Sequence, residues 1–227
     1  MSRLIVALIR HGDYQQRSNT PSAHQPFPLT TLGEQQARQA GTDIAAFAAE
    51  HSLTLHPSID CSSLLRAWQT ARLLADALPG TAPYSLHSTM ALAERSVGIA
   101  ANLTIPEIES LLTQDPRCDA PPENWKSNSH YCLPLPGAES LMTAGERVAR
   151  HLQQRTAEPV ATDTLKVFVG HGAALRHAAV HLGVLSEQQI PQLSMFHARP
   201  VYLEKTTDGW QHIAGEWKHR GGESYSD

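Results

Sequence analysis

The architecture of this chain can be predicted from one segment, Leu4-Ile5-Val6-Ala7-Leu8-Ile9-Arg10-His11-Gly12. Its first six residues are apolar without alternation, which predicts a strand covered on both faces, as in a parallel sheet. Gly12 permits a sharp turn directly after that strand. Because open α/β sheets bind ligands beyond the carboxyl ends of their strands, we expect Arg10 and His11 to lie at a ligand-binding edge.

A second segment repeats this pattern as Val167-Phe168-Val169-Gly170-His171-Gly172, and helix-forming residues follow it. Two such strands would bring two histidines to the same edge of one sheet. Glycines on both sides of His171 cost backbone entropy that a plain turn does not require. The repeat therefore indicates a site at this edge.

Two further polar residues lie between these segments. A strand predicted over Pro57 to Asp60 runs through serines into a helix, with Arg66 in the first turn. Glu94 follows a strand predicted around Tyr84 to His87, on a loop. Taken alone, Arg66 could be an exposed helix residue, and Glu94 could form a weak surface pair with Arg95. Together with the two histidines and Arg10, they suggest one constellation.

The chain resembles the histidine phosphatase superfamily, whose fold is called phosphoglycerate mutase-like. The matching motifs occur in the family's order and span most of the chain: Arg10-His11-Gly12; Leu29-Thr30-Thr31-Leu32-Gly33 with Gln36-Ala37; Ser62 to Ala71; Leu92 with Glu94; and Gly170-His171-Gly172. The resemblance implies an α/β fold, a three-layer α/β/α sandwich with a mostly parallel central sheet.

The resemblance also implies a role for each matching residue. His11 would accept the phosphoryl group, Arg10, Arg66 and His171 would bind its oxygens, and Glu94 would donate a proton. Elementary chemistry agrees, because phosphoryl transfer spreads negative charge over three oxygens and needs fixed positive charge and donors. Gly172 is expected to open a helix whose free amides favour a bound anion.

The remaining elements follow from periodicity and capping signals. Thr31 is a candidate N-cap with Glu34 at the capping-box position, Trp68 is expected in the core, and a turn is expected at Asp208-Gly209. Helices are predicted over Leu32 to Glu50, Leu64 to Leu78, Ile105 to Leu112 and Glu139 to Thr156, and strands within Ser194 to Trp217.

Composition limits the classes of function. With 227 residues, 41% of them hydrophobic, the chain is expected to form a single domain over residues 1–227. The net charge of −4 without basic runs argues against nucleic acid or a membrane as a partner. The start, Met1-Ser2-Arg3, leads directly into the first strand without a signal peptide, so we expect a cytoplasmic protein with its three cysteines reduced.

Two segments are candidates for substrate choice. The loop from Asp13 to Pro28 contains four candidate substrate-binding side chains. These are Tyr14, Arg17, Asn19 and His24. The family leads us to expect an Asn in this loop, but the position six after His11 is Arg17, so either Arg17 or Asn19 could contact phosphate. Residues 113–137 are proline-rich and predict a lid or insertion, the alternative being a surface excursion without a role. Residues 220–227 are expected to form a frayed tail.

Two histidines and one apolar segment bear on metal binding and on association between copies. His177 and His181 stand four apart on a predicted helix, but Ala178 follows His177 where a zinc-site glutamate would be needed. We therefore expect neither a metal nor a cofactor. The apolar Val201 to Leu203 could form an edge strand that pairs two copies in a homodimer.

These features predict a metal-independent phosphomonoesterase that acts on a small soluble phosphate ester through a phosphohistidine intermediate. A phosphoglycerate mutase is the first alternative, although residues 95–102 lack the acidic and aromatic pattern associated with mutases. A protein phosphatase acting on phosphohistidine or phosphoserine is the second. A non-catalytic module that binds a phosphorylated ligand is the third.

Overall fold

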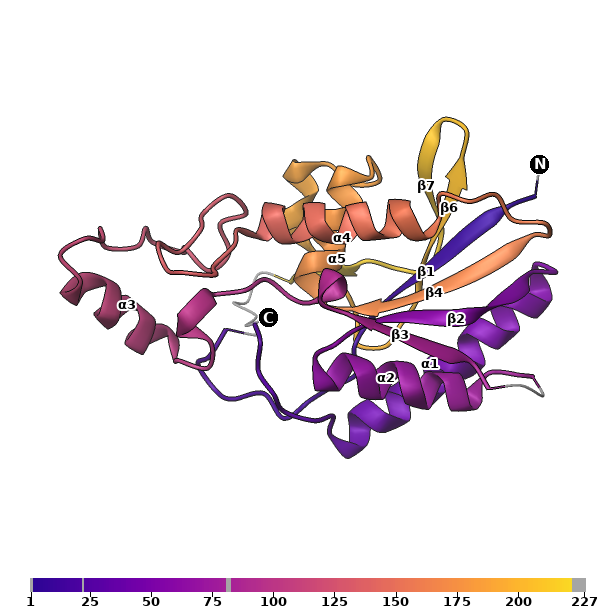
Figure 1. The fold of residues 1–227 in the computed structure, drawn as a ribbon, viewed down its shortest axis with the longest axis horizontal. Coiled ribbons are helices and arrows are strands. Elements are labelled where there is room, and N and C mark those ends of the chain that lie inside the picture. The colour runs from indigo at the N-terminus through magenta and orange to yellow at the C-terminus, as the bar shows by residue number, and fades with distance from the viewer. Residues whose placement is uncertain (1, 22, 81–82, 222–227) are drawn as a thin grey trace.

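A six-stranded sheet forms the centre of the computed structural model, which describes residues 2–21, 23–80 and 83–221 (Figure 1). The strand order is β3-β2-β4-β1-β6-β7. The first four of these strands run parallel to one another. Strand β6 runs antiparallel to β1, and β7 runs antiparallel to β6. Their bounds are β1 Leu4–Arg10, β2 Thr54–Ser62, β3 Ser85–Thr89, β4 Thr164–Gly170, β6 Val201–Thr206 and β7 Gly209–Ala214.

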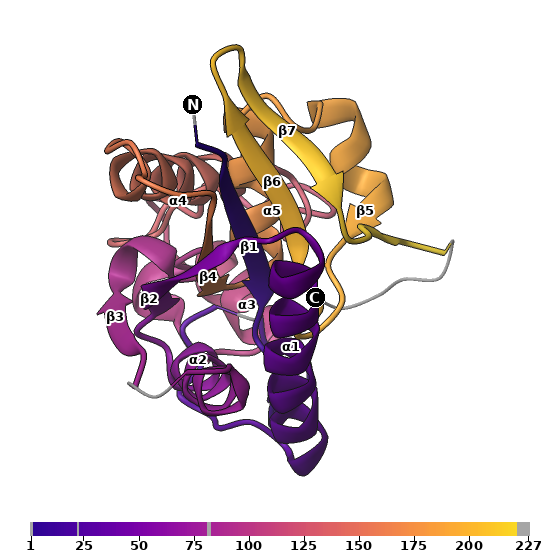
Figure 2. The same cartoon turned by 90° about the vertical axis from the view of Figure 1, so that its right-hand side faces the viewer.

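Helices cover both faces of this sheet, which gives the three-layer α/β/α sandwich (Figures 1 and 2). Residues Ile5, Ala7 and Ile9 of β1 face α1 (Thr31–Glu50) and α2 (Leu65–Ala77). Residues Val6 and Leu8 face α4 (Leu141–Arg155) and α5 (Gly172–His181). Side chains alternate between the faces of a strand, so an unbroken apolar run is required where both faces are covered.

The first helix begins one residue earlier than its sequence predicts. Thr30, not Thr31, is the N-cap, and its side chain accepts a hydrogen bond from the Gly33 amide. The prediction of a capping box with Glu34 was therefore wrong, because Gly33 holds the third helical position. A Cβ at Gly33 would lie 1.9 Å from the carbonyl oxygen of Asp13. Glycine is required here because the loop after His11 packs directly on the helix.

Two other expectations were wrong. Val201 to Leu203 lies in β6, which is paired with both β1 and β7. The segment is buried and does not form an edge, since β7 pairs with the side of β6 that β1 leaves open. Trp68 is 41% exposed on α2, because the inner face of that helix is filled by small residues such as Ala67 and Ala71.

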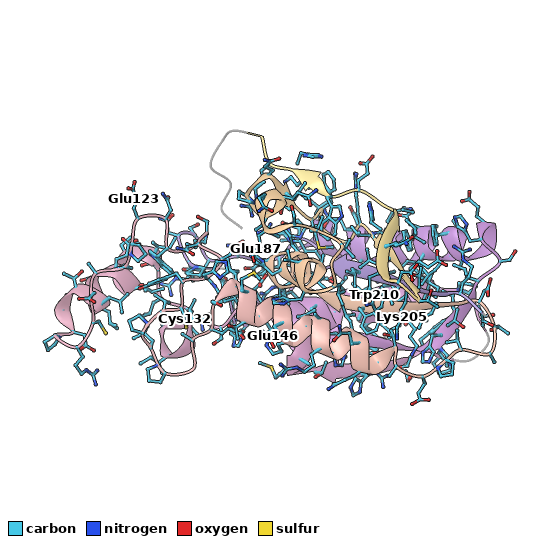
Figure 3. All side chains as sticks on the ribbon, turned by 90° about the horizontal axis from the view of Figure 1, so that it is seen from above. Glu123, Cys132, Glu146, Glu187, Lys205 and Trp210 are labelled. Atoms are coloured by element: carbon cyan, nitrogen blue, oxygen red, sulfur yellow. The ribbon has the colours of Figure 1, made fainter. Side chains whose placement is uncertain are left out.

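One part of the molecule projects away from the sheet. Helix α3 (Ile105–Gln114) and the segment 113–137 form a separate apolar cluster around Trp125, which is 2% exposed. The Trp125 indole donates to the Glu109 carboxylate at 3.1 Å. Figure 3 shows Glu123 and Cys132 at this end of the molecule, opposite Lys205 and Trp210 on β6 and β7. The segment is thus packed on a core of its own.

Short elements complete the fold. They are η1 Met90–Leu92, η2 Gly98–Ala100, η3 Glu187–Gln192, and the two-stranded sheet of β5 Leu193–Ser194 with β8 Lys218–His219. The Arg220 amide donates to the Gln192 carbonyl, so the predicted frayed tail does not begin at residue 220. Residues 222–227 of that prediction lie outside the described residues. Within the described ranges, no helix is both long and apolar enough to cross a membrane.

Candidate active site

His11 lies directly beyond the end of β1, where its amide donates to the Gly170 carbonyl of β4. Its Nδ1 lies 2.7 Å from the carbonyl oxygen of Gly12. A carbonyl oxygen only accepts hydrogen bonds, so Nδ1 carries the proton and Nε2 keeps a lone pair. Burial, followed by the nearby charge of Arg66, lowers the pKa of His11 well below its usual range. The ring is therefore neutral, and its tautomer is fixed.

Arg66 is fully buried in the first turn of α2 and donates from Nε to His11 Nε2 at 3.1 Å. Its two terminal nitrogens each donate at 2.9 Å, to the carbonyls of Ala23 and Gln25. The guanidinium also lies 4.5 Å from the ring centre of Tyr14. These contacts place a fixed positive charge beside His11 Nε2.

His171 lies beyond the end of β4, with its ring centre 5.0 Å from that of His11. Its Nε2 is 2.9 Å from the Ser62 hydroxyl, at the end of β2. Its Nδ1 is buried and has no hydrogen-bond partner within the described parts of the chain. Burial also lowers the pKa of His171 well below its usual range. An orphan ring nitrogen this close to His11 can bind an oxygen of a phosphoryl group.

Arg10, the last residue of β1, donates from Nη1 to the Met195 carbonyl at 3.0 Å. A Cβ at Gly172 would lie 3.1 Å from the Arg10 Cδ, which is tighter than an ordinary contact. The absence of a side chain at residue 172 thus lets the Arg10 side chain pass over the start of α5.

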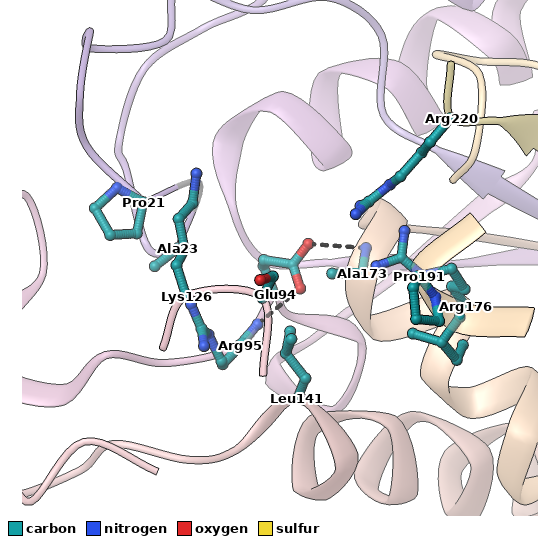
Figure 4. Close-up of a pocket in the computed structure, with 12 residues that line it drawn as sticks. Pro21, Ala23, Glu94, Arg95, Lys126, Leu141, Ala173, Arg176, Pro191 and Arg220 are labelled. Atoms are coloured by element: carbon teal, nitrogen blue, oxygen red, sulfur yellow. Dashed lines mark hydrogen bonds between the residues drawn. The ribbon is translucent and has the colours of Figure 1, made fainter. Parts of the chain in front are cut away.

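The carboxylate of Glu94 lies at the N-terminus of α5. It accepts hydrogen bonds from the amides of Arg95 at 2.9 Å and Ala173 at 3.3 Å (Figure 4). It also accepts one from the Ala174 amide at 3.1 Å. We predicted that the amides at this helix start would favour a bound anion, and in the structure the anion at Ala173 and Ala174 is Glu94 itself. Negative charge is stabilised at such a position by the helix dipole.

Arg147 of α4 supports the loop that carries Glu94. Its Nη1 donates to the carbonyls of Met90, Ala91 and Ala93 at 3.0 to 3.1 Å. It also pairs with Glu139. One guanidinium therefore fixes three backbone groups just before Glu94, and nothing in the local sequence indicated this.

Of the four loop residues predicted to bind substrate, two reach the site. The Tyr14 ring lies edge-on to His11 with centres 5.1 Å apart, and His24 Nε2 lies 3.2 Å from the Glu94 carbonyl. Arg17 is exposed and donates to the Asn102 carbonyl, and the Asn19 carbonyl accepts from the Ile105 amide. Both of these contacts lead toward α3, away from His11.

Three further residues contact the site and were not predicted as part of it. His197 Nδ1 lies 2.8 Å from the His11 carbonyl, and burial lowers the pKa of His197 to about 4. The Ser62 hydroxyl contacts His171, and the Thr70 hydroxyl accepts from the Gly12 amide at 3.0 Å. Ser62 and Thr70 fall inside a matching motif, so their positions carried a signal. His197 stands in no motif.

A cavity of about 350 Å³ opens beside Glu94 (Figure 4). Its wall combines four basic residues with small apolar ones. The basic residues are Arg95, Lys126, Arg176 and Arg220; the others are Pro21, Ala23, Ser127, Leu141, Ala173, Ile190 and Pro191. This volume suits a small molecule.

The histidines considered for metal binding are engaged elsewhere. His177 is buried between the Ala173 carbonyl and the Ser129 hydroxyl, and His181 contacts the Met142 carbonyl. Among the described residues, no cluster of three or more histidine, cysteine or acidic side chains has the arrangement of a metal site.

Known proteins resemble this chain along most of its length. The 2,3-bisphosphoglycerate-dependent phosphoglycerate mutase of Parvibaculum lavamentivorans is 26% identical over 212 residues, which cover 90% of this chain and 92% of that protein. The mutase of Rhizobium meliloti is also 26% identical, over 208 residues that cover 89% of this chain and 90% of that protein.

Solved structures show the same fold. The alpha-ribazole phosphatase of Shigella flexneri matches with a TM-score of 0.66 at 20% identity, covering 92% of this chain and 94% of that one. A mycobacterial glucosyl-3-phosphoglycerate phosphatase matches with a TM-score of 0.63 at 20% identity, covering 97% and 98%. The family model of the histidine phosphatase superfamily, branch 1, matches residues 6–217, and the chain belongs to that superfamily, whose members are phosphatases and mutases.

Proposed function

We propose that this protein is a metal-independent phosphomonoesterase that works through a phosphohistidine at His11. One observation carries the proposal. The Nε2 lone pair of a neutral, buried His11 lies 3.1 Å from the Arg66 guanidinium. Nucleophile and positive charge are thus in place before the substrate arrives, which is how enzymes stabilise a phosphoryl-transfer transition state.

The proposed reaction has two steps. In the first, His11 Nε2 attacks phosphorus, the bond to the leaving oxygen breaks, and Glu94 gives that oxygen its proton. In the second, the Glu94 carboxylate takes a proton from water, and the resulting hydroxide attacks phosphorus and breaks the N–P bond. Inorganic phosphate leaves, and both His11 and Glu94 return to their starting states. Arg10, Arg66 and His171 Nδ1 hold the phosphoryl oxygens in both steps.

A small substrate fits better than a protein. Lys126 and Pro191 line the cavity on opposite sides of Glu94, so a ligand there has walls on both sides (Figure 4). A phosphorylated side chain on a folded protein would need a shallower site.

A mutase is the second candidate, because the curated relatives compared above are phosphoglycerate mutases. It would use the same first step, but it would return the phosphoryl group to a bound product and not to water. Interconversion of 2- and 3-phosphoglycerate, followed by ³¹P NMR with and without 2,3-bisphosphoglycerate, separates the two candidates. A phosphatase releases inorganic phosphate at a rate that the bisphosphate does not increase.

The test of the proposal is turnover of p-nitrophenyl phosphate with acid and base quenching. We expect a trapped phosphoryl group that is labile in acid and stable in base, as a phosphoramidate is. His11→Ala should abolish both the trap and turnover, whereas His212→Ala, at an exposed histidine of β7, should retain them. Turnover by His11→Ala at the wild-type rate would reject the assignment, and a wild-type protein without turnover would be a binding module.

Chelation provides a second check. The positive charge in the proposed site comes from Arg10, Arg66 and histidine donors, so dialysis against EDTA should leave the rate unchanged, and vanadate should inhibit. Loss of activity on dialysis that zinc restores would contradict the metal-independent reaction.

A further inference from the structure

The peptide group between His11 and Gly12 is held from both sides. Its N–H, the Gly12 amide, donates to the Thr70 hydroxyl of α2 at 3.0 Å. Its C=O, the His11 carbonyl, lies 2.8 Å from Nδ1 of His197. A carbonyl oxygen only accepts hydrogen bonds, so His197 Nδ1 carries the proton and donates it. A peptide that is bonded at both its N–H and its C=O keeps one orientation.

The orientation of this peptide decides where the next carbonyl lies. The Gly12 carbonyl oxygen is 2.7 Å from His11 Nδ1 and thereby fixes the tautomer of the His11 ring. Residue 12 has to be glycine, because a Cβ there would lie 2.5 Å from the Gly33 carbonyl oxygen. Glycine has no local preference that would hold its carbonyl in one direction. The hydrogen bonds to the preceding peptide supply that restraint.

The backbone around His197 brings its ring to this peptide. The Ala198 amide donates to the Arg10 carbonyl at 2.8 Å, so the chain runs beside the end of β1. Ala198 is buried and has a φ of 50°, in the left-handed region that residues with a Cβ rarely adopt. Such a conformation costs free energy and persists only where the surrounding contacts hold it. The contact of His197 with His11 is thus maintained against backbone strain.

The ring of His197 is neutral near pH 7. Burial, followed by the nearby charge of Arg10, lowers the pKa of His197 to about 4. The two ring centres, of His197 and His11, lie 5.5 Å apart. A neutral ring can donate a hydrogen bond here without adding a positive charge beside His11. That hydrogen bond goes to the backbone of His11 and not to its ring.

We propose that His197 is a positioning residue, whose Nδ1–H fixes the His11–Gly12 peptide and through it the His11 ring. The inference rests on the proposed function, in which His11 Nε2 attacks phosphorus. As the N–P bond forms, the imidazole gains positive charge, and its Nδ1–H bond to the Gly12 carbonyl stabilises that charge. His197 therefore acts on the attacking group and not on the leaving group. Its loss should slow formation of phosphohistidine to a similar extent for all esters.

Two amide substitutions distinguish the nitrogens of His197. The amide of His197→Asn can occupy the place of Nδ1, whereas the amide of His197→Gln reaches the place of Nε2. We expect His197→Asn to keep a single-turnover burst close to the wild-type rate, and His197→Gln and His197→Leu to lose roughly tenfold or more. The losses should be equal for p-nitrophenyl phosphate and an alkyl ester, unlike those of Glu94→Gln. His212→Leu, at an exposed histidine of β7, should behave as the wild type.

The other outcomes of this experiment contradict the inference. A burst retained in both amide variants would show that the hydrogen bond is dispensable, and one retained only in His197→Gln would assign the role to Nε2. A burst lost in all three variants would show that the ring itself is needed. Urea titration identifies the folded variants, and if His197→Leu is unfolded, the comparison of His197→Asn with His197→Gln decides. Failure of both amide variants to fold would make His197 a residue of stability alone and overturn the inference.

The His11 ring can be observed without turnover. In long-range ¹H–¹⁵N NMR spectra assigned with His11→Ala, the Nδ1 proton of His11 should exchange slowly with water in the wild type and in His197→Asn. It should exchange faster in His197→Gln, where the Gly12 carbonyl is no longer held. This pattern in a protein that hydrolyses no ester would support the positioning contact and reject the proposed function alone. Unchanged exchange in His197→Gln would overturn the inference.

Discussion

Glu94 has to meet two opposite demands in the proposed reaction. Its carboxylate accepts three amide hydrogen bonds at the start of α5, which hold it in place to take a proton from water in the second step. Donation of a proton to the leaving oxygen needs the acid. The second step regenerates this acid, because the proton taken from water stays on Glu94.

Glu94→Gln should separate esters by their leaving group. It should slow phosphorylation of the enzyme by alkyl esters by roughly 10²- to 10⁴-fold, the usual contribution of general acid catalysis. Phosphorylation by p-nitrophenyl phosphate should slow much less, since that leaving oxygen needs little protonation. The measurement is the single-turnover burst, because the variant also slows hydrolysis of the intermediate. Equal losses for both esters would show that Glu94 acts through binding or structure.

The position of Glu94 depends on helix α4, which holds the backbone of the loop before it. Arg147 reaches from α4 to three carbonyls of the loop before Glu94, and its charge is balanced by Glu139. A planar guanidinium can serve several acceptors that a lysine ammonium cannot reach together. Arg147 thus positions the loop that carries Glu94, the proposed proton donor.

Arg147→Met should release the loop that carries Glu94. We expect the burst with alkyl esters to fall by roughly tenfold or more and the burst with p-nitrophenyl phosphate to fall less, as for Glu94→Gln, because a small displacement of a catalytic group is costly. Arg150→Met is the matched control, since Arg150 lies on the same helix in an exposed pair with Glu146. A loss that is equal for both esters would indicate general destabilisation.

The contact of α1 with the loop after His11 gives a second prediction at this scale. An alanine Cβ at Gly33 would overlap the Asp13 carbonyl oxygen, so Gly33→Ala should lower the free energy of unfolding by about 1–3 kcal/mol, the usual cost of overpacking. Gln35→Ala, at an exposed position of the same helix, should change it little. Urea titration of both variants provides the check. Wild-type stability in Gly33→Ala would mean that the loop and helix can move apart.

Across the whole molecule, the sequence predicts best what depends on local pattern. The unbroken apolar runs of β1 and β4 require helices on both faces, and their polar ends place His11 and His171 at one edge. The position of β6 could not be predicted, because an apolar run such as Val201 to Leu203 is compatible with both an inner strand and an edge strand. His197 and Arg147 were missed for a related reason. Their importance comes from contacts between segments far apart in the sequence.

The buried, neutral histidines should also make the folded protein less stable as the pH falls. Burial lowers the pKa of His177 to about 4, and it lowers the pKa of His11 and His171 well below the usual range. Below pH ~6.5 the unfolded chain therefore binds protons that the folded chain does not. Stability should be fully present above that pH and should fall as the pH decreases, by about 1.4 kcal/mol per pH unit for each such group.

His177→Gln isolates one of these groups. His177 contacts Ser129 and the Ala173 carbonyl and lies outside the proposed reaction, so its replacement leaves the other histidines in place. The variant will be less stable at every pH, but its free energy of unfolding should fall by about 2 kcal/mol less than that of the wild type between pH 7 and pH 5. Urea titrations at both pH values measure this difference, with His212→Gln as an exposed control that should keep the wild-type dependence. An unaltered pH dependence in His177→Gln would show that His177 takes up a proton as easily in the folded protein as in the unfolded chain.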